Sequence, residues 1–103
     1  MIDRSVEGVV VALCADYGRR AEAIRNHSVS HRTEMEFRYY NFKIYDAAAE
    51  VVGAREAEMY LKDVGERIGY ASSELADTCS ERSYKSRKIE VKKNIALKLH
   101  FMD

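Results

Sequence analysis

Apolar residues recur along most of this chain at steps of three and four, the spacing that places them on one face of an α-helix. The first such stretch covers residues 2–25 and ends at a polar connection, residues 26–30, in which Ser28 or Ser30 is available to cap the next helix. It predicts one amphipathic helix of about six turns. Its apolar stripe consists of Val6, Val9, Val10, Leu13, Tyr17, Ala21 and Ile24.

The same spacing predicts four further helices. Their ends are marked by glycines, which readily adopt the left-handed conformation that stops a helix, and by serines that suit an N-cap. The predicted elements are a helix over 31–52 ending at Gly53, a helix over 54–68 ending at Gly69, a brief helix capped by Ser72 or Ser73 and running through Thr78, and a last helix from about Ser80 to about Phe101.

Composition agrees with an all-helical fold. The chain has no proline and only five glycines among 103 residues, so little interrupts a long helix. Apolar residues make up 47% and charged residues 33%, which is typical of a folded chain rather than a disordered one. A chain of this length is sufficient for one modest core. We therefore predict an all-α fold, in which a single helical domain of four to five helices spans residues 1–103.

The helix predicted over 31–52 has an unusual concentration of aromatic residues in its first half. A helix that is apolar on more than one side is either central to the fold or part of a subunit interface, and the small size of the chain favours an interface. A platform for stacking bases is the alternative, although such platforms are usually built on sheets or loops. The predicted interface residues of a homo-oligomer, with a dimer favoured, are Phe37, Tyr39, Tyr40, Phe42 and Tyr45.

Charge is distributed unevenly although the formal net charge is zero. Residues 80–103 contain seven Lys or Arg against three acids, whereas residues 1–79 contain ten Lys or Arg against fourteen acids. A basic segment on an acidic body suggests a face that meets a polyanion. The alternative is a solvated helix whose lysines only maintain solubility.

On a helical wheel, the last helix separates its apolar and basic residues. Basic and polar residues lie opposite the apolar face, close to the helix N-terminus, whose free backbone donors also favour anions. A short helix, a tight turn and a longer basic helix would form a helix-turn-helix, whose second helix enters the major groove of DNA. The predicted core-facing residues are Tyr84, Val91, Ile95 and Met102, flanked by Leu99.

The candidate DNA contacts fall into two groups. Arg82 and Lys85 are placed to reach guanine or phosphate, and Ser86 a base edge or phosphate. The remaining basic residues suit phosphate contacts, and these are Lys88, Lys92 and Lys93. We therefore predict a helical hairpin over 1–53 as the dimerisation region and a helix-turn-helix-like region over 54–103.

The run Cys79-Ser-Glu-Arg-Ser-Tyr-Lys-Ser-Arg-Lys, continued by Val91, Ile95-Ala96 and Leu99, resembles the C-terminal helix-turn-helix of ArpU-like regulators. These are phage and prophage transcriptional regulators that are similar in this region to region 4 of bacterial sigma factors. The resemblance implies that Ser80 is the helix N-cap, Tyr84 a core anchor, and Arg82, Lys85 and Ser86 groove-facing. It makes double-stranded DNA the expected partner and leaves contact with RNA polymerase open.

The likeness covers about the last thirty residues, and the chain departs from the family pattern before them. The family's turn carries a glycine or an apolar residue before the serine and follows a longer helix. Here residues 74–79 leave a turn about two residues shorter and contain no glycine. The helix predicted over 54–68 is then an alternative supporting helix.

No pattern indicates an enzyme, a metal site or a cofactor. Glycine-rich phosphate loops, nucleophile elbows and zinc motifs are absent, and His27, His31 and His100 have no partner at a useful spacing. Cys14 and Cys79 are expected to be reduced thiols. The apolar run over 9–15 is too short to span a membrane and lacks the pattern of a signal peptide, so we expect a cytoplasmic protein without membrane contact.

Two functions of different classes therefore remain. The first is a DNA-binding transcriptional regulator of phage or prophage type that reads duplex DNA with its basic C-terminal helix. The alternative is a helical interaction or assembly module that oligomerises through the aromatic helix over 31–52 and does not bind DNA. The sorting of basic residues onto one helix face and the family resemblance favour the first.

Overall fold

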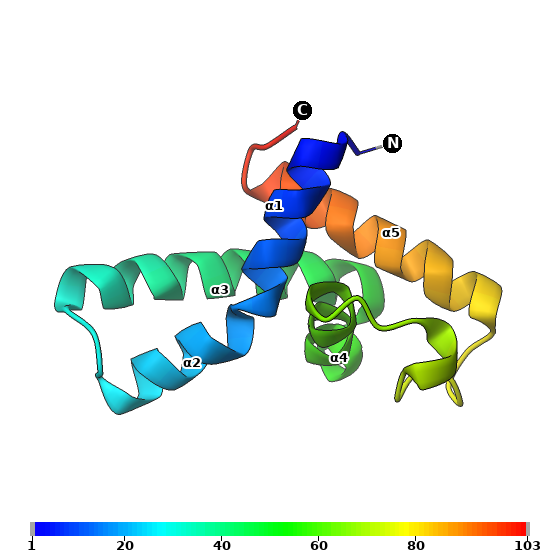
Figure 1. The fold of residues 1–103 in the computed structure, drawn as a ribbon, viewed down its shortest axis with the longest axis horizontal. Helices are drawn as coiled ribbons and strands as arrows, with labels where there is room; N and C mark the ends of the chain where they lie inside the picture. The colour runs from blue at the N-terminus through cyan, green and yellow to red at the C-terminus, as the bar shows by residue number, and fades with distance from the viewer. Residues whose placement is uncertain (1, 103) are drawn as a thin grey trace.

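The computed structural model describes residues 2–102, so Met1 and Asp103, the two ends of the predicted domain, lie outside the described residues. This part of the chain is helical and contains no strand, which confirms the all-α prediction. None of its helices is long and apolar enough to cross a lipid bilayer. The elements, shown in Figure 1, are α1 (Arg4–Ala15), α2 (Tyr17–Asn26), α3 (His31–Val52), α4 (Ala54–Gly65), the 3-10 turn η1 (Tyr70–Ser72) and α5 (Glu81–Lys98).

The single helix predicted over 2–25 is wrong, because the chain bends at Asp16 and divides into α1 and α2. The end of α4 lies directly against this bend. A Cβ added to Gly65 would be 2.5 Å from the Ala15 backbone nitrogen and 2.7 Å from the Cys14 carbonyl carbon. Because of the bend, α1 packs against α4 and α5, whereas α2 packs along α3 (Figure 1).

A buried polar network holds the bend. Arg20, only 4% exposed, donates from Nη2 to the Leu13 carbonyl at 2.5 Å and from Nε to Asn41 Oδ1 at 2.7 Å. Asn41 in turn donates from Nδ2 to the Tyr17 carbonyl at 3.1 Å. The Leu13 carbonyl is one of the last four of α1, which have no partner within the helix, so Arg20 satisfies it from the next helix. Burial lowers the pKa of Arg20.

The helix α3 matches the bounds predicted from the sequence. Ser30, one of the two predicted caps, accepts a hydrogen bond on its Oγ from the Thr33 backbone N–H at 3.2 Å. Gly53 ends α3 at a φ of 88°. The first half of α3 lies beside α2 as a hairpin that extends away from the other helices (Figure 1).

The core lies where α3 packs against α4 and α5, and where α1 packs against α4. Of the inward residues predicted for the last helix, Tyr84, Val91, Ile95 and Leu99 are buried. Met102 is only partly buried and lies beyond α5, which ends at Lys98 rather than near Phe101. The predicted stripe of the first helix is wrong in part, because Val9 is 47% exposed. The buried face of α1 consists instead of Val10, Val11 and Cys14.

Residues 66–80 differ most from prediction. The helix predicted to reach Ile68 ends at Gly65, and the brief helix through Thr78 is replaced by the single turn η1 and irregular backbone. Side chains stabilise this segment in place of a helix. The Tyr70 hydroxyl lies 2.7 Å from the Ala76 carbonyl and 2.8 Å from the Cys79 carbonyl.

Candidate nucleic-acid interface

The N-terminal turns of α5 are fixed by a cap and by an aromatic anchor. Ser80 accepts a hydrogen bond from the Ser83 backbone N–H at 3.2 Å, as predicted. The Tyr84 ring packs between Tyr60, at 5.7 Å between ring centroids, and Tyr70, at 5.5 Å. The first turns of α5 therefore have a fixed orientation although little else covers them.

The outward side of α5 carries a row of residues at steps of four, three and four: Arg82, Ser86, Ile89 and Lys93. Arg82 and Ser86 are exposed, Ile89 is 48% exposed and Lys93 is partly exposed. Among residues 2–102, no ion pair involves Arg82 or Lys93. We refer to these four residues as the outer row.

Lys85 lies beside the outer row and is exposed. Its Nζ lies 2.7 Å from Glu81 Oε2, one turn earlier on the same helix. Both side chains are more than half exposed, and an exposed pair of this kind contributes little to stability. Lys85 is therefore free to exchange this carboxylate for another anion.

Lys88 and Lys92, predicted to contact phosphate, are instead engaged with the body of the protein. Lys88 Nζ donates to the Ile68 carbonyl at 2.7 Å and lies 5.3 Å from the centroid of the Tyr84 ring. Burial lowers the pKa of Lys88, and the nearby charge of Lys92 acts in the same direction. Lys92 lies 3.5 Å from Glu7 on α1. Both lysines hold α5 against its neighbours.

A shallow groove of about 260 Å³ runs between α5 and the start of η1. One wall is the backbone at Gly69 and Tyr70, and the other is a line of three lysines one turn apart, Lys85, Lys88 and Lys92. Ile89 lies at its edge and also borders a second hollow beside Lys93. The groove places positive charge along the flank of the outer row.

A terminal helix-turn-helix is not confirmed. The whole segment 66–80 separates α4 from α5, whereas the prediction required a short helix and a tight turn directly before Ser80. The supporting contacts of α5 come mainly from α3, with smaller contributions from α1 and α4. In the described residues, α5 is therefore supported mainly by α3, and not by a short helix directly before it as predicted.

The site predicted from the sequence leaves out Ile89 and Arg87, which are exposed on α5. Ile89 lies in the outer row, and its position next to Arg82 on the helical wheel was the available signal. Arg87 is also exposed and follows Ser86 directly. Ile89 extends the outer row, whereas Arg87 lies on another side of α5, beside Tyr60.

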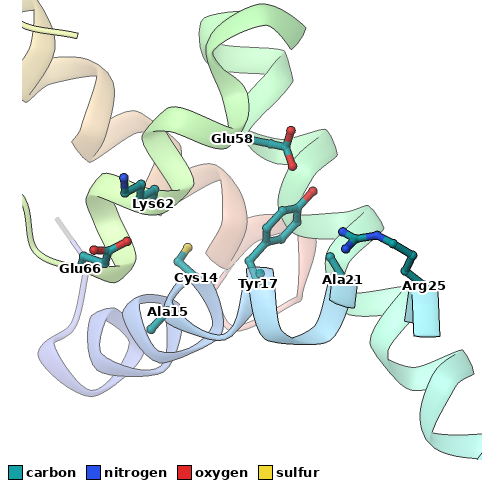
Figure 2. A pocket seen from close by; sticks show the side chains of 9 residues that line it. Cys14, Ala15, Tyr17, Ala21, Arg25, Glu58, Lys62 and Glu66 are labelled. Atoms are coloured by element: carbon teal, nitrogen blue, oxygen red, sulfur yellow. The ribbon is translucent and has the colours of Figure 1, made fainter. Parts of the chain in front are cut away.

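A separate cleft of about 390 Å³ lies between the α1–α2 bend and α4 (Figure 2). Its lining is mixed and includes Cys14, Tyr17 and Lys62, with Arg25 at the end farther from Cys14 (Figure 2). Burial raises the pKa of Cys14 to about 12, so its thiol stays protonated at neutral pH and is a poor nucleophile. Burial, aided by Glu58, also raises the pKa of Tyr17 to about 12.

The histidines do not gather with other ligands in the described structure. His27 ends α2, and its Nδ1 lies 3.0 Å from Glu34 Oε1 on α3. Within residues 2–102, no group of three His, Cys, Asp or Glu side chains is placed to hold a metal ion.

Comparison with known proteins provides no family for this chain. No family model, no curated protein and no solved structure matches it.

Proposed function

We propose that the chain is a DNA-binding transcriptional regulator of phage or prophage type, and that α5 lies in the major groove with its outer row toward the bases. The observation that carries this proposal is the outer row itself. It is an exposed line of residues in which two cations have no carboxylate partner in the described structure. The likeness of residues 79–99 to ArpU-like regulators supports the same function.

The outer row has the chemistry that base edges recognise. Arg82 is suited to a bidentate contact with the O6 and N7 atoms of guanine, and Ser86 to a base edge or phosphate. Ile89, an apolar residue between two cations, matches the methyl group of thymine. Lys93 lies at the end of the outer row and Lys85 lies beside it, and both would contact phosphates.

The partners of Lys88 and Lys92 reduce the number of phosphate contacts that we propose. A lysine that donates to a buried carbonyl would lose that bond in reaching for phosphate. Arg82 is assigned to a base, and Arg87 lies on another side of α5 beside Tyr60, so Lys85 and Lys93 remain as the cations available to phosphate. About two neutralised phosphates would weaken binding roughly tenfold between 50 and 200 mM salt.

The test is fluorescence anisotropy of a labelled mixed-sequence duplex, titrated with the protein at 50 and 200 mM salt. We expect binding that weakens by that factor between the two salt concentrations. Arg82→Ala and Lys93→Ala should each weaken binding roughly tenfold. Arg25→Ala is the matched control, because it removes one exposed cation from the end of α2, which packs against α3 rather than α5.

The outcomes separate the two functions. If Arg82→Ala weakens binding equally on all duplexes, Arg82 contacts phosphate rather than guanine. If circular dichroism shows a folded protein that binds no duplex at either salt concentration, the DNA proposal is wrong. The interaction or assembly module built on residues 31–52 would then be the better candidate.

A further inference from the structure

The outward face of α3, on the side opposite α2, carries three apolar residues at steps of four and three. Met35 is 58% exposed, Tyr39 49% and Phe42 66%. The opposite side of α3 faces α2. There the Arg19 guanidinium lies 5.5 Å from the centroid of the Phe37 ring, and Asn41 Oδ1 accepts a hydrogen bond from Arg20 Nε. We refer to Met35, Tyr39 and Phe42 as the α3 strip.

The α3 strip differs from the interface predicted from the sequence. Tyr39 and Phe42 belong to both, whereas Phe37, Tyr40 and Tyr45 are partly buried within their own chain. Tyr40 and Tyr45 pack against the core, and the Tyr45 hydroxyl lies 3.4 Å from the Ala54 carbonyl. Met35, which the aromatic pattern could not reveal, completes the exposed line.

We propose that the α3 strip pairs with the same strip of a second copy of this chain, with the two α3 helices antiparallel. This inference goes beyond DNA binding and does not depend on it. A twofold arrangement uses the same patch on both copies, as in most homodimers.

The apolar area of the strip suits such an interface. With about 200 Å² for each fully exposed side chain of this size, the three residues leave roughly 350 Å² uncovered on each copy. A standard interface covers about 800 Å² per partner, of which about 60% is apolar. The strip would supply most of that apolar centre, and the polar residues around it would form the rim.

Charges at the two ends of the strip favour the antiparallel direction. Arg32 and Asp46 lie seven residues before and seven residues after Tyr39, a spacing that keeps all three near one side of the helix. An antiparallel pair with its axis near Tyr39 brings Arg32 of one copy toward Asp46 of the other. A parallel pair would instead place like charges together.

The acidic end also has an incompletely neutralised pair of carboxylates. Asp46 and Glu50 share a single ammonium group, Lys98, whose Nζ lies 3.3 Å from Asp46 and also contacts Glu50. These two carboxylates raise the pKa of Lys98. Arg32 of a second copy would supply the second positive charge.

The test is sedimentation equilibrium of the full chain between about 1 and 200 μM, without DNA, because a dimer fraction rises with concentration by mass action. We expect a monomer–dimer equilibrium. Phe42→Ser should raise the dissociation constant roughly tenfold or more, because each dimer loses two of the six apolar side chains of the paired strips, and Phe42 is the most exposed of the three on each copy. Val9→Ser is the control, since Val9 is also an exposed apolar residue of a helix but lies on α1, outside the strip.

A charge exchange tests the direction of pairing. Arg32→Glu should weaken the dimer, and the double variant Arg32→Glu with Asp46→Arg should restore much of the loss. A folded protein that stays monomeric throughout, or a dimer that Phe42→Ser leaves unchanged, would overturn the proposed face. Failure of the double variant to recover would overturn the antiparallel arrangement. None of these results depends on DNA binding.

Discussion

The hydroxyl group of Tyr84 on α5 donates to Asp63 Oδ2 on α4 at 2.8 Å, and both residues are almost fully buried. The same carboxylate oxygen accepts a hydrogen bond from the Ser73 hydroxyl at 2.5 Å. Asp63 therefore joins α4, the segment before α5 and the first turns of α5. Because a buried carboxylate is costly without such donors, this junction fixes the orientation of the outer row.

Two stacked tyrosines provide a matched pair for testing this junction. Tyr84→Phe should lower the free energy of unfolding by about 1–3 kcal/mol, because it removes a donor from a buried carboxylate. Tyr60→Phe should change it by less than about 0.5 kcal/mol, because the buried Tyr60 hydroxyl forms no hydrogen bond of good geometry in the described structure and interacts only with the exposed side chain of Arg87. Urea denaturation of both variants measures the difference. Equal losses would show that the Asp63 contact contributes nothing specific.

The close approach of α4 to the bend predicts an effect of glycine substitution. Gly65→Ala should lower the free energy of unfolding by about 1–3 kcal/mol, since its Cβ would meet the Ala15 backbone at 2.5 Å. Gly18→Ala is the control, because nothing lies within 4 Å of its Cβ and alanine favours a helix by about 1 kcal/mol. Thermal denaturation should show Gly18→Ala equal to or more stable than the parent. A harmless Gly65→Ala would mean that α4 does not constrain the bend.

The network at Arg20 predicts coupled effects on stability. Arg20→Met and Asn41→Leu should each cost about 2 kcal/mol, because each leaves a buried polar partner unsatisfied. The double variant should cost less than the sum by about 1 kcal/mol or more, since the two side chains satisfy each other. A double-mutant cycle in urea measures this coupling. Additive losses would indicate that the two residues act independently.

Buried tyrosines predict a loss of stability at alkaline pH. Burial, aided by Asp63, raises the pKa of Tyr84 to about 12, against an ordinary value of 10.0 in the unfolded chain. The folded state therefore binds the Tyr84 hydroxyl proton more tightly than the unfolded state does. The stability that the neutral hydroxyl contributes is fully present below pH 10 and is lost as the pH rises to about 12. The free energy of unfolding should fall by about 2 kcal/mol from this group over that range. Urea denaturation at several pH values should give a shallower fall for Tyr84→Phe than for the parent.

Local chemistry determined much of this protein from its sequence. The limits of α3, the caps at Ser30 and Ser80 and the buried face of α5 all agree with prediction. Each depends on helical periodicity or on a hydrogen bond within a few residues, so the information lies in neighbouring positions. The outer residues Arg82 and Ser86 were placed correctly at the surface for the same reason.

Tertiary packing decided the features that depend on distant residues. The break at Asp16 lies where Gly65, fifty residues along the chain from Ala15, comes close to the backbone. The apolar periodicity continues across Asp16, so the sequence gives no sign of the break. Segment 66–80 is irregular because Tyr70 and Asp63 satisfy its polar groups, which removes the need for a helix. Lys88 and Lys92 look like free cations in the sequence, yet the fold brings the Ile68 carbonyl and Glu7 to them. A charge becomes available to a partner only when the folded chain leaves it unpaired, and that is decided by contacts between distant segments.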